Sequence, residues 1–224
     1  MRVHRAAALA EVAGPLLIAS IAEVIARRGR CRLGLSGGST PAGTMRWLAE
    51  HLAEVDMARL WITWVDERNV PLHHPDSSHR LAAETGLLER AGMVLPMCFG
   101  GDLESEKIGF EAGFEVDFDG ALDIALLGVG PDGHIASLFP GHAGLSATGL
   151  CVAIPDSPKP PDERLSLTMT VLEAVDVAVL LARGAGKAAA LSRRDPAMPI
   201  SRYRPRGDYH WVLDEAAAAA LEKR

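Results

Sequence analysis

The feature that most constrains the fold is an apolar run, residues 121–127, that leads into the glycine-rich loop GVGPDGH at residues 128–134. Asp123 is the one charged residue in the run, which has the length and composition of a buried strand. In open α/β sheets ligands bind beyond the carboxyl ends of the strands, and glycine lets the backbone approach a ligand closely. We therefore expect an α/β fold whose functional site includes Asp132 and His134.

The same loop contains the pattern GxGxxG, which also occurs in dinucleotide-binding folds. That fingerprint requires a helix that begins at the third glycine, here Gly133, and an acidic residue about 20 positions later. Pro140 stops the chain soon after the loop, and the nearest acid, Asp156, lies in a proline-rich segment. A nicotinamide cofactor is therefore disfavoured, and we expect no cofactor. A purely structural role is the alternative for His134, but a histidine beside glycine at a strand end is hard to bury.

The composition favours one domain with an aliphatic core. The chain has 224 residues, of which 48% are hydrophobic and 5% aromatic, and no linker rich in serine, glycine or charge divides it. We therefore expect a single domain over residues 1–224, with a parallel sheet covered by helices. The formal net charge of −6 offers no basic surface to a nucleic acid or an anionic membrane, so neither is an expected partner.

The cysteines are odd in number and widely spaced, at Cys31, Cys98 and Cys151. They form no CxxC pair, and no histidine stands at zinc-finger spacing from them. A disulfide framework or a structural zinc site is therefore not expected. The pattern is typical of buried thiols in a reducing compartment, and we expect a cytoplasmic protein.

The N-terminal segment allows two interpretations. Arg2 and Arg5 precede an uncharged run, residues 12–22, that resembles the apolar region of a signal peptide. The segment also has the pattern of an alanine-rich helix over residues 5–28 that ends at a glycine. We favour the helix, because its removal would uncover the strand that begins near Cys31. No stretch reaches the roughly 18 apolar residues of a transmembrane helix.

One strand end carries groups suited to an anion. A strand at 31–35 runs into the loop SGGSTP, residues 36–41, and a helix at 42–53 follows. Backbone N–H groups at a helix N-terminus form a ready anion site. The alternative is a plain strand-to-helix turn with a Ser or Thr cap and proline at the first helical position. The loop lacks the GK[ST] ending of a Walker motif.

The next strand, residues 60–65, ends in Asp66, Glu67 and Arg68. Side chains alternate along a strand, so Asp66 and Arg68 are expected to face the same crevice. Glu67 points the other way and is expected to make a structural pair. The alternative for all three is a solvated run of charges.

Three histidines follow, His73, His74 and His79, near an aspartate. They lack the i,i+4 or HExxH spacing of a zinc site, so we expect no metal. The other expected elements are helices at 78–89 and 102–116, strands at 94–99, 151–154, 175–182 and 210–213, and a C-terminal alanine-rich helix.

Two more cations stand after expected strands. The strand 175–182 runs into RGAGK, residues 183–187, where the ammonium of Lys187 can reach a phosphate. Solvent exposure is the alternative for this lysine. The rigid loop 155–161, rich in proline, leads to Arg164.

Four stretches together resemble the 6-phosphogluconolactonase family, within the glucosamine/galactosamine-6-phosphate isomerase superfamily. The matching stretches are LSGGSTP at 35–41, DERNVP at 66–71, GVGPDGH with SLFPG at 128–141, and GAGKA at 184–188. They occur in the family's order, and a weaker match, WxLDxAA, covers 211–217. The joint match spans the chain and is highly specific.

The resemblance implies a Rossmann-like α/β fold without a nucleotide, in which a mostly parallel sheet carries helices on both faces. It also implies hydrolysis of 6-phospho-D-glucono-1,5-lactone to 6-phosphogluconate in the oxidative pentose phosphate pathway. The related deaminases place Asn-Glu-Pro after the Asp-Gly-His segment, whereas this chain has Leu138-Phe139-Pro140. The missing glutamate favours the lactonase. The chain departs from the family at position 78, where the family commonly has asparagine and this chain has Ser78. This difference bears on the contacts that the loop makes to the sugar hydroxyls.

A lactone is an activated ester, so one well-placed base suffices, and we expect His134 to activate a water. Asp132 or Asp66 is expected to orient the imidazole or to hold sugar hydroxyls, and the sequence leaves open which does which. The residues expected to hold the phosphate are Ser36, Gly37, Gly38, Ser39, Thr40, Arg68, Arg164 and Lys187.

The expected partner is a small sugar-phosphate lactone, and the expected state is a monomer or weak homodimer. Two other functions remain as alternatives. The first is an amino-sugar-phosphate deaminase or isomerase. The second is a non-catalytic sugar-phosphate sensor, although the chain has no recognisable DNA-binding appendage.

Overall fold

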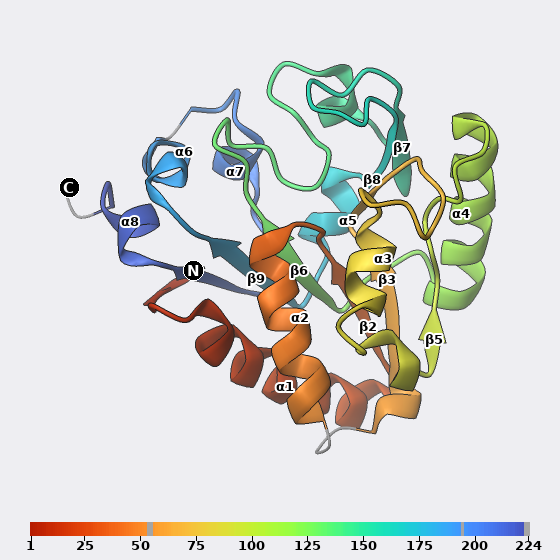
Figure 1. The fold of residues 1–224 in the computed structure, drawn as a ribbon, viewed down its shortest axis with the longest axis horizontal. Coiled ribbons are helices and arrows are strands. Elements are labelled where there is room, and N and C mark those ends of the chain that lie inside the picture. Colours follow the sequence, from red (N-terminus) through yellow and green to blue (C-terminus); the bar gives the residue numbers. More distant parts are fainter. Residues whose placement is uncertain (53–55, 194, 222–224) are drawn as a thin grey trace.

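The computed structural model describes residues 1–52, 56–193 and 195–221. Within them, seven parallel strands form the central sheet in the order β1-β10-β9-β6-β2-β3-β5 (Figure 1). The strands are β1 (Arg2–Arg5), β2 (Cys31–Leu35), β3 (Leu60–Trp64), β5 (Met93–Val94), β6 (Ile124–Gly128), β9 (Val177–Ala182) and β10 (Asp208–Leu213). The apolar run at 121–127 therefore supplies the middle strand, as its composition predicts.

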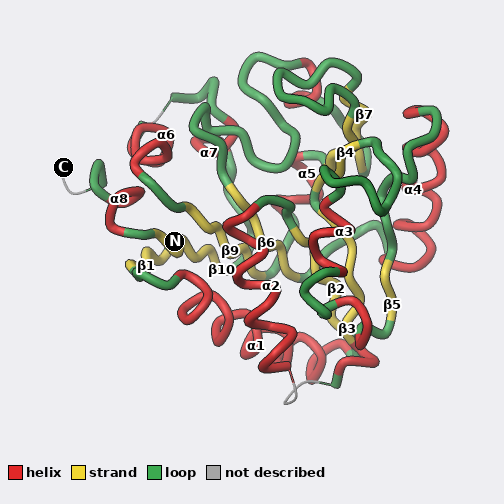
Figure 2. Tube along the Cα trace, in the orientation of Figure 1, coloured by secondary structure: helices red, strands yellow, loops and turns green. Residues whose placement is uncertain are grey.

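A second, antiparallel sheet of three strands, in the order β4-β8-β7, follows the carboxyl end of β3. Its strands are β4 (Asp66–Arg68), β8 (Arg164–Leu167) and β7 (Cys151–Ile154). The backbone N–H of Leu167 donates to Val65 O at 2.8 Å, which ties the two sheets together. Figure 2 shows loops, in green, gathered above the central strands on the side of this second sheet. The charged segment at 66–68 is thus a strand, which the sequence did not predict.

Helices cover both faces of the central sheet. On β3, Trp61 packs against Phe118 and Trp64 against His79, with ring centroids 5.9 and 5.0 Å apart. Side chains three residues apart on a strand point to opposite faces, so α4 and α3 lie on opposite sides. The helices are α1 (Leu9–Arg28), α2 (Ser39–His51), α3 (Ser78–Ala83), α4 (Leu103–Phe118), α5 (Met169–Glu173), α6 (Ala188–Ser192), α7 (Pro199–Arg202) and α8 (Glu215–Ala218). The predicted Rossmann-like, mostly parallel α/β fold is confirmed.

The N-terminus differs from the expected helix over 5–28. Residues 2–5 form β1, which pairs in parallel with β10, and α1 begins at Leu9. The short segment RVHR has no helical period, and pairing with the open edge of β10 decides its conformation.

Helix α1 is long and apolar enough to cross a membrane, with a mean hydropathy of 1.8 over its most apolar window. This differs from the expectation that no stretch of the sequence is long and apolar enough for a transmembrane helix. Leu17 and Ile21 of this helix are fully buried in the core, where the sheet supplies their apolar surroundings. In this structure α1 therefore packs as a core helix.

Helix α4 is held by a ladder of phenylalanines. Phe110, Phe114 and Phe118 lie four residues apart, so they share one face, and consecutive rings stack at 5.3 and 5.6 Å. All three are buried, and Phe114 and Phe118 are fully so. This face fixes α4 against the sheet.

We expect Phe114→Ala to lower the free energy of unfolding by about 3–5 kcal/mol, because it removes a fully buried ring and leaves a cavity. Ile108→Ala, in the same helix, is the matched control, since Ile108 is 65% exposed, and should change stability by less than about 0.5 kcal/mol. Urea unfolding of both variants measures the difference. Equal effects would contradict the assigned packing of α4.

Candidate active site

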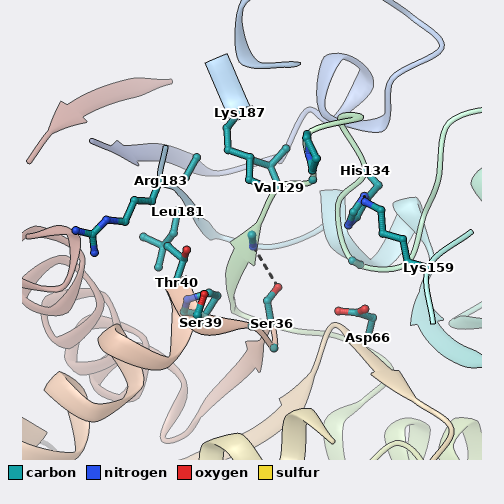
Figure 3. A pocket seen from close by; sticks show the side chains of 18 of the residues that line it. Ser36, Ser39, Thr40, Asp66, Val129, His134, Lys159, Leu181, Arg183 and Lys187 are labelled. Atoms are coloured by element: carbon teal, nitrogen blue, oxygen red, sulfur yellow. Dashed lines mark hydrogen bonds between the residues drawn. The ribbon is translucent and has the colours of Figure 1, made fainter. Parts of the chain in front are cut away.

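The site lies where three adjacent strands end. β9, β6 and β2 are neighbours and parallel, so the loops that follow them leave the same edge of the sheet. These loops, together with parts of the second sheet and the 155–163 loop, line a cavity of about 250 Å³ (Figure 3).

The structure brings nearly all of the predicted site residues to this cavity. Those that line it are Ser36, Gly37, Gly38, Ser39, Thr40, Asp66, Arg68, His134, Arg164 and Lys187. Asp132 stands behind His134, with which it is in direct contact. The cavity therefore joins segments from residue 36 to residue 187.

Backbone geometry pairs Asp132 with His134. The N–H of Gly133 donates to Gly130 O at 3.0 Å, and the N–H of Gly130 donates to His134 O at 2.9 Å, which closes a tight loop. A Cβ on residue 130 would overlap both the imidazole Nδ1 and the Asp132 carboxylate. Glycine at this position therefore makes the pair possible. A helix does not begin at the third glycine in the described part of the chain, which removes the support for the dinucleotide alternative.

In the pair, Nδ1 of His134 lies 2.6 Å from Oδ1 of Asp132. Burial alone would raise the pKa of Asp132, but the hydrogen bond and charge of His134 and the ammonium of Lys159 hold this pKa well below its usual value. An ionised carboxylate only accepts hydrogen bonds, so in the neutral imidazole Nδ1 carries the hydrogen and Nε2 the lone pair. The imidazole is 18% exposed and tilts against the Phe139 ring at 4.8 Å. The geometry thus supplies a base with a fixed tautomer.

The glycine-rich loop after β2 becomes the start of α2. Gly38 has a φ of +95°, which favours glycine, and α2 begins at Ser39, three residues earlier than expected. The alternative interpretation, a Ser or Thr cap followed by proline at the first helical position, is wrong in both parts: the described start of α2 has no side-chain cap, and Pro41 stands at the third position. The hydroxyls of Ser39 and Thr40 therefore stand beside the first amides of the helix, which have no acceptor within it.

Ser36 joins this loop to the central strand, because its Oγ accepts from the N–H of Gly128 at 3.3 Å (Figure 3). Lys187 approaches from the other side at the end of the short 3-10 helix η5 (Ala185–Lys187). The turn before it is held by Asp214, whose two carboxylate oxygens each lie 3.0 Å from the N–H of Gly184. Burial, followed by the charge of Lys159, lowers the pKa of Lys187. A partly desolvated ammonium of this kind gains from an anionic ligand.

Asp66 and Arg68 reach the cavity from β4, as the alternation of side chains predicts. Oδ2 of Asp66 accepts from Ser137 Oγ at 2.7 Å, and Nη1 of Arg68 donates to Asp76 O at 2.7 Å. Asp66 is not seen in contact with His134 among the described residues, whereas Asp132 is. The sequence left open whether Asp132 or Asp66 lies beside the imidazole, and the contact shows that Asp132 does.

Glu67 points away from the cavity and is 1% exposed. Its carboxylate accepts 2.8 Å hydrogen bonds from the N–H groups of Arg68, Ser78 and His79. Burial raises its pKa, and these hydrogen bonds oppose the rise. The Ser77 hydroxyl also donates to Glu67 at 3.3 Å, so its partners are the N–H group of the next residue and groups at the start of α3, in place of the charged partner implied by a structural pair.

Ser78 lies beneath the glycine-rich loop. Its Oγ is buried, and a Cβ on Gly37 would overlap it. The residue at which the chain departs from the family therefore supports the loop from below, and the backbone of Gly37 separates it from the cavity.

Lys159 is a cavity residue that the sequence did not predict. Its Nζ lies 3.2 Å from Asp132 Oδ1 and 3.1 Å from His134 Nδ1. The segment was recognised as a rigid loop, and a lysine flanked by prolines between two strands was the available signal. The role of this lysine could not be predicted, because it depends on a tertiary contact. The pairing of β7 with β8 carries the loop across to the Asp132–His134 pair.

Arg164, expected at the phosphate, is 4% exposed and donates mainly to the backbone of that loop. Nη2 donates to Lys159 O at 2.8 Å and to Pro160 O at 3.2 Å, and Nε donates to Pro161 O at 3.1 Å. Most of its donors are therefore committed to positioning the loop. Its phosphate contact stays a prediction.

Among the described residues, no cluster of His, Cys, Asp or Glu side chains could hold a metal ion. His73, His74 and His79 therefore do not form a metal site there. Cys31, Cys98 and Cys151 are free and buried, and burial raises the pKa of each thiol. They are thus poor nucleophiles at neutral pH.

Comparison with known proteins identifies the family. The family model described as glucosamine-6-phosphate isomerases/6-phosphogluconolactonase matches residues 4–211. The chain belongs to this family. A 6-phosphogluconolactonase from Mycobacterium tuberculosis is 35% identical over 95% of this chain and 94% of its own length. One from Rattus norvegicus is 38% identical over 91% and 89%.

Solved members of the family have the same fold. The 6-phosphogluconolactonase from Trypanosoma cruzi superposes with a TM-score of 0.88 at 25% identity and covers 99% of this chain and 97% of its own. A monomeric glucosamine-6-phosphate deaminase superposes with a TM-score of 0.79 at 24% identity, over 98% of this chain and 100% of its own. The second likeness concerns the fold alone, so the site must distinguish the two activities of the family.

We expect Arg164→Gln to loosen the 155–163 loop, because it removes hydrogen bonds from a buried cation to three successive carbonyls. Amide exchange at Ser157 and Lys159 should become about tenfold faster or more, since each charged hydrogen bond contributes about 1.5–3 kcal/mol. Arg183→Gln is the matched control, because the Arg183 side chain is 68% exposed. Hydrogen exchange followed by NMR measures both. Unchanged exchange in Arg164→Gln would contradict the anchoring role.

Proposed function

We propose that this chain hydrolyses 6-phospho-D-glucono-1,5-lactone to 6-phospho-D-gluconate, with His134 as general base. The observation that carries the proposal is the Asp132–His134 pair at the edge of a cavity whose other side is built from helix-start amides, hydroxyls and Lys187. A base and an anion site side by side are what a phosphorylated lactone requires. The names of the relatives, 6-phosphogluconolactonases, agree with this chemistry.

The phosphate of the substrate lies at the glycine-rich loop in this proposal. The amides and hydroxyls of residues 36–40 surround the anion, and Lys187 supplies a point charge. Arg68 approaches from β4, and its buried Nε has no partner among the described residues. These groups fix the ring so that the lactone carbonyl faces His134.

The reaction then needs one proton shuttle. Nε2 of His134 takes a proton from a water as the water oxygen bonds to the lactone carbonyl carbon. Backbone N–H groups of the glycine loops stabilise the tetrahedral oxyanion. The intermediate collapses as the bond from that carbon to the ring oxygen breaks, and the ring oxygen receives the proton from the imidazolium. Asp132 keeps the imidazole oriented, and Asp66 holds a sugar hydroxyl.

His134→Ala should lower kcat about 10²- to 10⁴-fold with a smaller effect on KM, because the variant loses its base and keeps the phosphate site. His73→Ala, an exposed histidine outside the cavity, is the control and should keep wild-type rates. The assay follows lactone generated in situ, against a blank without enzyme. Wild-type kcat in His134→Ala would refute the assigned base.

Lys187→Ala should raise KM about 10- to 100-fold and change kcat little, because it removes a charged contact to the phosphate, which does not react. Lys107→Ala is the control, since Lys107 lies on α4 and pairs with Glu111 at 3.6 Å, away from the cavity. Steady-state kinetics of both variants separate KM from kcat. A loss confined to kcat would place Lys187 at the reacting carbonyl.

Two assays separate the alternatives. Ammonia release from glucosamine 6-phosphate would indicate the deaminase, and phosphosugar binding without turnover would indicate a sensor. The segment Leu138-Phe139-Pro140, without the deaminase glutamate, supports the lactonase. A single domain, a monomeric or weakly dimeric state and a cytoplasmic location complete the proposal, and light scattering tests the oligomeric state.

A further inference from the structure

Lys159 lines the cavity and brings a positive charge to the Nδ1 side of the His134 imidazole. Its Nζ lies 3.1 Å from Nδ1 of His134 and 3.2 Å from Oδ1 of Asp132, and Figure 3 shows its side chain alongside the imidazole. Nδ1 already carries a hydrogen directed at Asp132, so it offers Lys159 no lone pair. The ammonium therefore donates to the carboxylate, and its contact with the imidazole is one of charge alone.

The loop holds Lys159 in this place. Its carbonyl accepts from Arg164 Nη2 at 2.8 Å and from Ser157 Oγ at 2.9 Å. At the base of the loop, the N–H of Ser157 donates to Asp162 O at 2.8 Å. The side chain is 39% exposed, so the charge is only partly screened by water. A lysine fixed by its own backbone in this way is unlike a freely moving surface lysine.

The two neighbours of the imidazole act in opposite directions. The Asp132 carboxylate stabilises an imidazolium, the form that cannot act as a base. A cation 3.1 Å from Nδ1 destabilises the same imidazolium. The carboxylate orients the ring, and the ammonium opposes the effect of the carboxylate on the charge of the ring.

We propose that Lys159 is a positioning residue whose charge keeps the His134 imidazole neutral and Asp132 in place as its acceptor. The inference rests on the proposed function, because it assigns Lys159 a role toward the proposed base. It predicts that the charge of Lys159 matters, and that contact with substrate does not.

The other charged groups around the imidazole are Lys187, Arg164 and His142, whose described contacts are with other groups. Lys187 faces Lys159 and Asp132 from η5. Arg164 lies 5.8 Å from the Phe139 ring centroid and donates to the loop carbonyls. His142 lies on another side of Phe139 and bonds to Asp156 at 2.8 Å. Among these described groups, Lys159 is the cation recorded in contact with the His134 ring.

The first arm of the test needs no substrate. The imidazole of His134 is titrated by NMR in the wild type, Lys159→Gln and Lys159→Arg, with His134→Ala to assign its signals. We expect the midpoint to move to higher pH by about one unit in Lys159→Gln, because the opposing charge is gone, and to stay near the wild type in Lys159→Arg. An unchanged midpoint in Lys159→Gln would overturn the proposal.

The second arm measures kcat/KM against pH, with a blank at each pH because the lactone also opens spontaneously. In Lys159→Gln the acidic limb should move up by the same amount as the NMR midpoint, and the loss of activity should be larger on the acidic side than on the alkaline side. Lys159→Arg should follow the wild-type profile. A rise in KM at every pH, with an unmoved limb, would make Lys159 a substrate contact and overturn the proposal.

The two measurements distinguish failure of the proposed function from failure of the role assigned to Lys159. Absence of lactone hydrolysis in the wild type would refute the proposed function, and the titration would still decide whether Lys159 controls the charge of the imidazole. Hydrolysis with an unshifted titration would refute the role of Lys159 alone.

Discussion

The parallel pairing of β2, β6 and β9 is the constraint on which the rest of the structure depends. Three loops distant in sequence leave the same edge of the sheet because these neighbouring strands run in one direction. One loop supplies helix-start amides, the next supplies Asp132 and His134, and the last supplies Lys187. A single antiparallel strand among the three would send its loop to the opposite edge. The cavity is thus a consequence of strand direction.

The second sheet contributes to the site through antiparallel strand pairing. Its antiparallel register places Arg68 opposite Arg164 and Asp66 opposite Ser166, so polar groups from the first and last thirds of the chain face each other. It also carries the proline-rich loop to the imidazole. The cavity is therefore rich in cations although the chain is acidic overall, with a formal net charge of −6. Among the described residues, five cationic side chains line it, where the net charge gives no indication of them: Arg68, Lys159, Arg164, Arg183 and Lys187.

Sequence reasoning succeeded where the signal is local. Glycines beside polar groups at strand ends identified the loops of residues 36–41, 128–134 and 183–187, because close approach and tight turns need that residue type. It failed for β1, where the open edge of β10 decides the conformation, and for β4, where a charged segment pairs with a distant strand. Lys159 was missed for the same reason, since its importance arises from contacts with residues 25 and 27 positions away.

By itself, the sequence determined the class of the fold, the central strand and most residues of the cavity. Apolar runs specify buried strands, and glycine and proline specify turns, through the conformations of the residues themselves. Only the tertiary structure decided that Asp132 is the neighbour of His134, that Arg164 supports a loop, and that Lys159 contacts the imidazole. These assignments depend on distances between side chains brought together by strand pairing, and no local propensity encodes such distances.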